Sequence, residues 1–187
     1  MKPVAAYLEA EQRFRAHVIQ LARHEGRAFE VKRGQLLLNP GGSSSPLFVI
    51  EEGAAHAFVE SSSGQQTLRL GYPGEFLASL PSFYLGVATP IGIQALRRCR
   101  GYTLTRQQLR SSLQSHAEVV DDYLHMLEAF VCGHTARELD LLESDPAKRY
   151  AALVKRSPQV LQHIPLRYLA SYLRMAPATL SRLRRAS

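Results

Sequence analysis

Residues 164–187 read IPLRYLASYLRMAPATLSRLRRAS, and this stretch decides the fold. Pro165 and Pro177 each suit the first turn of a helix, where the fixed φ is favourable and the missing amide proton costs nothing. A short turn, residues 174–176, separates the two amphipathic runs. Ala170 offers the small side chain that two tightly crossing helices need. Two short helices joined by a turn of three or four residues form a helix-turn-helix.

The second of these helices has a distinct outward face. When it is projected at about 100° per residue, Leu180 and Leu183 face inward and Arg182 lies near the middle of the opposite side. Small residues together with arginines suit a helix that enters a DNA major groove. Arginine can hold a guanine with two parallel hydrogen bonds, so Arg182 is the expected base-reading residue.

Further residues of the same segment are expected at the DNA. Ala178 shares the outward face, and Ser181 and Thr179 can reach phosphates or base edges. Arginines at the edges of such a surface contact phosphates, which position the helix without specifying a sequence. Four arginines fit this role: Arg167, Arg174, Arg184 and Arg185.

The charge of the chain supports a polyanionic partner. Residues 145–187 hold nine basic residues and one acidic residue, a net charge of +8, whereas residues 1–144 hold 14 basic and 15 acidic residues, a net charge of −1. The whole excess of positive charge therefore lies in the last quarter of the chain. Such asymmetry predicts that this end binds double-stranded DNA.

Three blocks precede the helix-turn-helix. Residues 4–25 have helical periodicity and end at Gly26. From there to about residue 105, glycine or proline follows every 8 to 12 residues, which is typical of a compact β domain. Residues 107–143 lack proline and predict one long helix, and Pro146 begins another helix that ends at Ser157. The expected domains are 1–106, 107–143 and 144–187, and the expected fold class is α+β.

The long helix carries a narrow apolar seam. A second copy of the chain could cover this seam, which predicts a parallel homodimer. The alternative is a helix that folds back wholly on its own β domain. The seam residues are Leu113, Val120, Tyr123, Leu127 and Phe130.

The order of these blocks resembles the Crp/Fnr family of bacterial transcription regulators. VKRGQLLLNPGGSSSPLFVIEEGAAHAFV is similar to the opening strands of that family's cyclic-nucleotide-binding-like β-roll, a jelly-roll-like domain. IPLRYLASYLRMAPATLSRLRR is similar to the helix-turn-helix of members with tails of the form YLASYLG-x-x-PETLSR, which is associated with the Bacteroidetes. The resemblance implies a long dimerisation helix, a winged-helix-like DNA-binding domain, binding to inverted-repeat DNA, and RNA polymerase as a further partner.

The resemblance also implies an effector site, and the sequence departs from it there. YPGEF resembles the start of the phosphate-binding cassette, so Gly74, Glu75 and Phe76 are candidate effector-binding residues. Members that bind cyclic AMP have an arginine shortly afterwards, and here none lies between Gly74 and Ala95. A buried phosphate without a counter-charge is costly. We therefore expect no control by cyclic AMP and leave open an absent effector or an uncharged or apolar one.

Two departures affect the helix-turn-helix itself. Arg174 stands where these relatives have glycine at the turn, and a positive φ there would cost an arginine about 1 kcal/mol relative to glycine. Ala178 replaces a glutamate that could accept a hydrogen bond from cytosine, so the base preference is expected to differ.

Composition limits which other classes of protein the chain could belong to. No run reaches the roughly 18 apolar residues of a membrane helix, and a cytoplasmic protein is expected. Cys99 and Cys132 are interpreted as two buried thiols. No catalytic residue, metal site or cofactor is predicted. Two alternatives stay open, namely a ligand-binding or scaffold protein with a nonspecific basic tail, and a cupin-type metalloenzyme, for which His56 is the only histidine of the β block.

Overall fold

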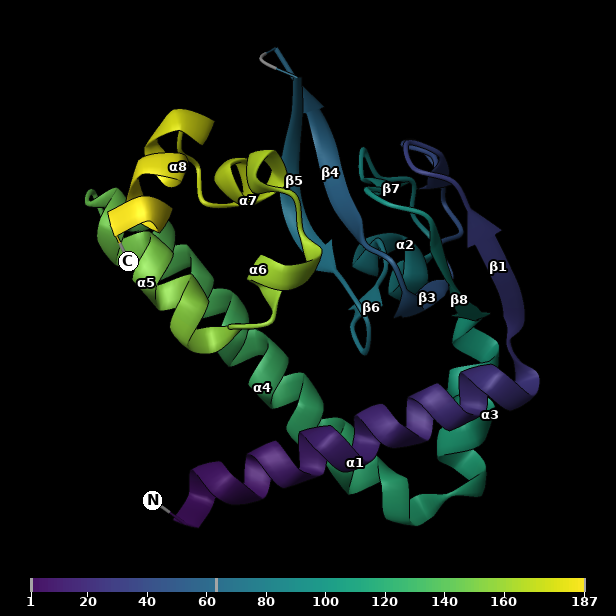
Figure 1. Ribbon diagram of the computed structural model, residues 1–187. Coiled ribbons are helices and arrows are strands. Elements are labelled where there is room, and N and C mark those ends of the chain that lie inside the picture. Colours follow the sequence, from purple (N-terminus) through teal and green to yellow (C-terminus); the bar gives the residue numbers. More distant parts are fainter. Residues whose placement is uncertain (1, 63, 187) are drawn as a thin grey trace.

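A computed structural model describes residues 2–62 and 64–186 (Figure 1). A long N-terminal helix is followed by a β domain, two further helices and a helical C-terminal domain. The β domain holds the strands β1 (Arg27–Val31), β2 (Leu36–Leu38), β3 (Leu47–Glu52), β4 (Ala55–Ser61), β5 (Gly64–Gly71), β6 (Phe76–Leu77), β7 (Gly92–Ala95) and β8 (Cys99–Leu104). The helices are α1 (Lys2–Glu25), α2 (Leu80–Leu85), α3 (Arg106–Ser115), α4 (Ala117–Leu142), α5 (Pro146–Arg156), α6 (Val160–His163), α7 (Leu166–Tyr172) and α8 (Pro177–Ala186).

The β domain is a roll of two antiparallel four-stranded sheets. Their strand orders are β1-β8-β3-β6 and β2-β7-β4-β5. Between the sheets lies an apolar core that includes Phe48, Ile50, Leu77 and Ile93, all buried. The α+β class and the β-roll predicted from the sequence are thus confirmed.

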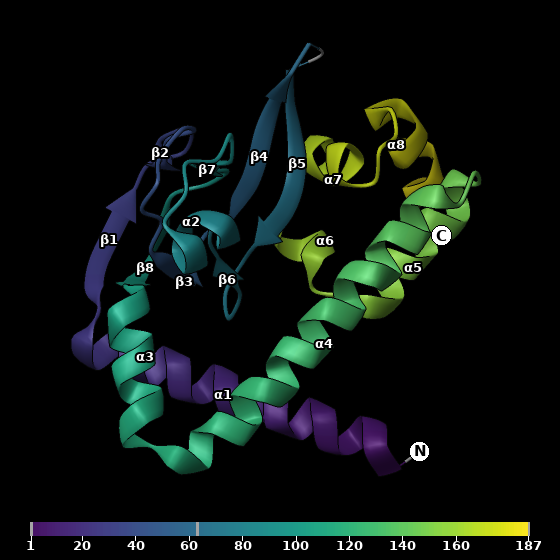
Figure 2. The ribbon, with the colours of Figure 1, turned by 180° about the vertical axis from the view of Figure 1, so that it is seen from behind.

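The helical segment after the β domain differs from the prediction. The sequence predicts one helix over 107–143, whereas the chain bends at His116 (φ −129°, ψ 77°) and forms α3 and α4. The break falls after Ser111, Ser112 and Ser115, and serine competes for backbone hydrogen bonds and so weakens a helix. The ring of His116 lies 3.0 Å from the carbonyl oxygen of Ser112 and stabilises the end of α3. Helix α4 is still the longest helix and crosses α1 (Figure 2).

The C-terminal domain is helical throughout residues 144–186, and this described stretch holds no strand that would form a wing. Asp145 caps α5 by accepting a hydrogen bond from the amide of Ala147 at 2.8 Å, next to Pro146 in the first turn. Helices α7 and α8 form the predicted pair around the turn at Arg174. Ala170 and Leu180 are fully buried where the two helices meet.

The C-terminal domain packs on the β domain through helix α7, which lies against β5 (Figure 1). The Ser171 hydroxyl accepts a hydrogen bond from the amide of Thr67 at 2.9 Å, and the Gln66 amide donates to the Ser171 carbonyl at 2.5 Å. One apolar cluster runs across the boundary and joins Ala54 and Leu96 to Leu169 and other residues of the C-terminal domain. The two domains therefore share a core.

Cysteine placement corrects one expectation. Cys99 is buried, and burial raises its pKa to about 11, whereas Cys132 on α4 is exposed. The prediction of two buried thiols is therefore wrong for Cys132. No helix within residues 2–62 and 64–186 is long and apolar enough to cross a membrane.

Arg174 has a φ of 54°, the left-handed conformation that the sequence singled out. We expect Arg174→Gly to raise the free energy of unfolding by about 1 kcal/mol, because glycine adopts this conformation without a Cβ clash. Urea denaturation would measure the change. Arg174→Ala is the matched control, since it removes the charge but keeps Cβ; equal stabilisation by both variants would assign the gain to the lost charge instead.

His56 on β4 predicts a pH dependence of stability. It is fully buried between Thr67, whose hydroxyl lies 3.0 Å from Nδ1, and the rings of Phe58 and Tyr168. Burial lowers its pKa to about 4 from 6.5. Between pH 6.5 and 4, His56 is therefore protonated in the unfolded chain but neutral in the folded chain. The stability that is present above pH 6.5 is lost as the pH falls toward 4.

We expect this one residue to remove about 3 kcal/mol of stability by pH 4. The measurement is the difference in unfolding free energy between the natural chain and His56→Gln, which can still bond Thr67, at pH 7 and pH 4. A difference that does not change with pH would contradict the buried neutral histidine.

Candidate DNA-binding surface and ligand pocket

Helix α8 turns its predicted face to solvent. Ala178, Arg182 and Arg185 are exposed, and Thr179 and Ser181 are partly exposed on the same helix. Leu180 is fully buried on the opposite side, in the core shared with α5 and α7. The structure thus brings together the small residues and arginines that the sequence assigned to one face.

The other predicted phosphate contacts surround this face. Arg184 and Arg174 are exposed, at the end of α8 and at the turn before it. Arg167 on α7 is exposed as well, and its guanidinium lies over the ring of Tyr168 at 4.4 Å and bonds the hydroxyl of that residue. All eight predicted DNA-contacting residues therefore lie on α7, on α8 or in the turn between them.

Arg149, a basic residue to which the sequence gave no special role, is held inside the domain. Its guanidinium donates to the carbonyl of Glu143 at 2.5 Å and to that of Leu173 at 3.1 Å. These bonds tie the start of α5 to the end of α7. Part of the basic excess thus serves the fold, which net charge alone cannot reveal.

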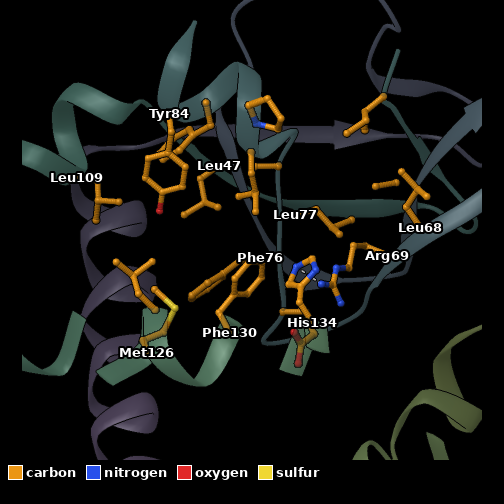
Figure 3. A pocket seen from close by; sticks show the side chains of 18 of the residues that line it. Leu47, Leu68, Arg69, Phe76, Leu77, Tyr84, Leu109, Met126, Phe130 and His134 are labelled. Atoms are coloured by element: carbon orange, nitrogen blue, oxygen red, sulfur yellow. Dashed lines mark hydrogen bonds between the residues drawn. The ribbon is translucent and has the colours of Figure 1, made fainter. Parts of the chain in front are cut away.

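A pocket of about 440 Å³ lies between the β-roll and helix α4 (Figure 3). Most of its lining is apolar and comes from four helices and from both sheets. Leu47, Leu77, Leu109, Met126 and Phe130 are among the lining residues that point into it. The volume suits a small organic ligand.

The predicted effector turn borders this pocket. Gly74 adopts φ 87° in the turn between β5 and β6, and Glu75 and Phe76 line the pocket. The Glu75 carboxylate lies 3.5 Å from the guanidinium of Arg15, which also bonds the Gly74 carbonyl at 3.1 Å. Glu75 therefore already has a counter-charge on α1, which it shares with Glu11.

The pocket also has a cationic end that sequence reasoning missed. Arg69 on β5 and Arg137 and His134 on α4 line it there. Arg69 bonds the His134 ring, and the two side chains lie together in Figure 3. Burial lowers the pKa of Arg69 and of His134, and the positive charge of Arg137 adds to both shifts. His134 is thus neutral at pH 7.

A β-bulge explains why Arg69 faces the pocket. Ala57 pairs with Arg69 and Phe58 with Thr67, so Leu68 is an extra residue in β5. A bulge places two consecutive side chains on one side of the strand. Leu68 and Arg69 accordingly both line the pocket, while the Thr67 hydroxyl lies 3.0 Å from Nδ1 of His56, whose ring contacts Tyr168 on α7. A pattern of strict alternation along the strand cannot show this.

Helix α4 has two apolar stripes, and the predicted seam lies mostly on the inner one. Tyr123 contacts Phe14 at a ring distance of 5.2 Å, and Leu113, which lies on α3 before the bend, packs in the same cluster. Leu127 and Phe130 line the pocket. Val120 is outside the pocket lining and is exposed, together with Leu124, Val131, Leu139 and Leu142, whereas Phe130 lines the pocket although it is exposed to a similar extent.

The described residues hold no group of three or more histidine, cysteine, aspartate or glutamate side chains that could bind a metal. His56, on which a cupin-type site would depend, is hydrogen-bonded to Thr67 in the core between β4, β5 and α7.

Comparison with known proteins agrees with this architecture. Residues 28–116 match the cyclic nucleotide-binding domain family. No curated protein sequence matches the chain significantly.

Solved structures extend the likeness over nearly the whole chain. FixK2 from Bradyrhizobium japonicum has a TM-score of 0.70 at 14% identity, covering 86% of this chain and 83% of that one. The c-di-GMP responsive regulator CLP from Xanthomonas campestris has a TM-score of 0.62 at 14% identity, covering 91% and 90%. The catabolite activator protein from Thermus thermophilus has a TM-score of 0.54 at 21% identity, covering 90% and 81%.

Proposed function

We propose that this chain, which carries a cyclic nucleotide-binding domain on the fold of the Crp/Fnr regulators, is a sequence-specific DNA-binding transcription regulator. The observation that supports this most directly is the outward face of α8, where Ala178, Ser181 and Arg182 lie opposite the buried Leu180. Arg182 reads a base in the major groove, and the surrounding arginines hold phosphates. The protein acts in the cytoplasm, with RNA polymerase as a further partner.

The regulator binds an inverted repeat as a homodimer. Regulators of this fold bind DNA as dimers, and two recognition helices enter successive major grooves about 34–36 Å apart. The exposed stripe of α4, Val120, Leu124 and Val131, supports a parallel pairing with a second copy. The inner residues Leu113, Tyr123, Leu127 and Phe130 serve the chain's own packing and pocket, so we place the dimer contact on the outer stripe.

Cyclic AMP does not control this regulator. Helix α2 and its flanks supply no arginine to the pocket, and Glu75 is already paired with Arg15. The hydroxyls of Tyr84 and Tyr123 lie 3.3 Å apart and bond each other. The wall that α2 and its flanks form beside the Gly74 turn is apolar and offers no cationic donor to a cyclic phosphate held there.

The test is selection from random duplex DNA by the purified protein, without added ligand and at near-physiological salt. We expect an enriched inverted repeat with half-sites about one helical turn apart. On the selected site, Arg182→Ala should cost about 1–3 kcal/mol of binding free energy and relax the preference at one base position. Titration by fluorescence anisotropy measures both. Arg100→Ala on β8, far from α8, is the control.

Two outcomes would change the proposal. Equal loss on all sequences would make Arg182 a phosphate contact. Retention without any enriched motif, with or without cell extract, would favour the alternative of a ligand-binding or scaffold protein with a nonspecific basic tail.

The dimer has its own prediction. Val131 is 62% exposed on the outer stripe of α4, and a glutamate there would place two like charges in an apolar contact. We expect Val131→Glu to yield a monomer in sedimentation and to lose at least tenfold in affinity for the full repeat, about 1.4 kcal/mol or more. Leu85→Glu on α2, 73% exposed, should leave the natural assembly intact. Unchanged sedimentation of Val131→Glu would move the dimer contact elsewhere.

A further inference from the structure

The cationic end of the pocket is the feature that the proposed function leaves unexplained. Arg69 and Arg137 reach it from opposite walls, one from β5 and one from α4. Within the described residues, neither guanidinium makes an ion pair, although nine other ion pairs occur. Glu138 also lines the pocket but is exposed and makes no ion pair in this part of the chain. Two partly buried cations thus face a cavity without a matching carboxylate.

Tyr172 holds Arg137 in place, but one hydrogen-bond donor of the Arg137 side chain has no acceptor among the described residues. Its guanidinium lies 4.3 Å from the centre of the Tyr172 ring and donates from Nη2 to the Tyr172 carbonyl at 3.3 Å. Its Nε is buried and has no hydrogen-bond partner among the described residues. A buried donor without an acceptor costs about 1–3 kcal/mol, more for a charged group.

Arg69 is similarly short of acceptors. It bonds the neutral His134 ring and lies 5.4 Å over the Phe130 ring. The hydroxyl of Tyr172 is a further polar neighbour, and Arg137 and Arg156 add like charges. Rings and a hydroxyl do not offset a guanidinium charge as an oxyanion does, and the flat fork of an arginine matches a carboxylate with two parallel bonds.

We propose that the pocket binds an amphipathic organic carboxylate, whose charged group lies between Arg69 and Arg137 and whose apolar body extends toward Leu47, Leu109 and Met126. This inference rests on the proposed function for its regulatory meaning and names the effector class of that regulator. The two arginines are distinct from the Gly74–Phe76 turn, which borders the same pocket and whose Glu75 is paired with Arg15. The apolar lining accounts for the body of the ligand, and the arginines account for its charge.

The same contact links the ligand to the DNA-binding domain. Tyr172 is the last residue of α7, and Arg137 holds both its ring and its carbonyl. A carboxylate that draws Arg137 toward the cavity changes the contacts of Arg137 with the ring and the carbonyl of Tyr172. Only a ligand that binds one arrangement better than the other can shift the equilibrium between them. Ligand occupancy and DNA affinity are therefore coupled through one side chain.

The experiment compares decanoate with decan-1-ol on the full-length protein by isothermal titration calorimetry at pH 7.5. The two probes share an apolar chain and differ in charge. We expect decanoate to bind at least about tenfold more tightly, since a hydrogen bond to a charged partner exceeds a neutral one. Arg69→Gln and Arg137→Gln should each weaken decanoate by about tenfold and leave decan-1-ol within about twofold. Arg13→Gln on α1, which lies outside the pocket, is the matched control.

Three results would overturn the inference: no binding of decanoate, equal binding of the two probes, or loss of decanoate affinity in Arg13→Gln as large as in the pocket variants. Unfolding temperatures of all variants separate a lost site from a lost fold, and Met126→Trp, which fills the apolar end, should abolish binding while both arginines stay. DNA selection is a separate measurement. Decanoate binding without sequence-selective DNA binding would refute the proposed function alone, and the reverse result would refute the carboxylate site alone.

Discussion

The docking of α7 on β5 is the constraint on which the rest of the structure depends. Ser171 and Thr67 bond at 2.9 Å, and the apolar cluster around Leu169 continues into the β domain through Leu96. Burying such a surface contributes about 25 cal/mol per Å² of apolar area. The position of the recognition helix is thus set by the β domain as well as by its own small core. A signal from the pocket has a short path to α7, because the strand that supplies Arg69 is the strand on which α7 lies.

Much of this fold could be predicted from residues with one strong local preference. Pro146 and Pro177 start helices, and Arg174 takes the positive φ that its place in the turn implied. The outward face of α8 follows from helical periodicity, because a helix that buries Leu180 must expose Arg182. In each case the deciding interaction lies within a few positions along the chain, where sequence patterns carry information.

The features that sequence reasoning missed depend on contacts between distant segments. The bend at His116 turns the chain between α3 and α4, which both pack on α1 and both line the pocket. Helical periodicity predicts an apolar seam but does not say which apolar stripe faces the same chain. Tyr123 packs against Phe14, which lies more than a hundred residues earlier in the chain. From the sequence alone, Arg137 is expected to be a solvated basic residue. Its place beside β5 and Tyr172 becomes evident only in the folded structure.

The bulge at Leu68 has a consequence for how such proteins can diversify. It separates β5 into two parts with opposite phase, so that the Thr67 hydroxyl lies beside His56 and Arg69 faces the cavity. Substitutions on the two sides of the bulge therefore answer to different selective pressures. A descendant could exchange Arg69 for a residue that suits another ligand and keep Thr67 and its domain contact untouched. One inserted residue in a strand thus allows the ligand preference of the pocket to change while the packing of α7 on β5 stays the same.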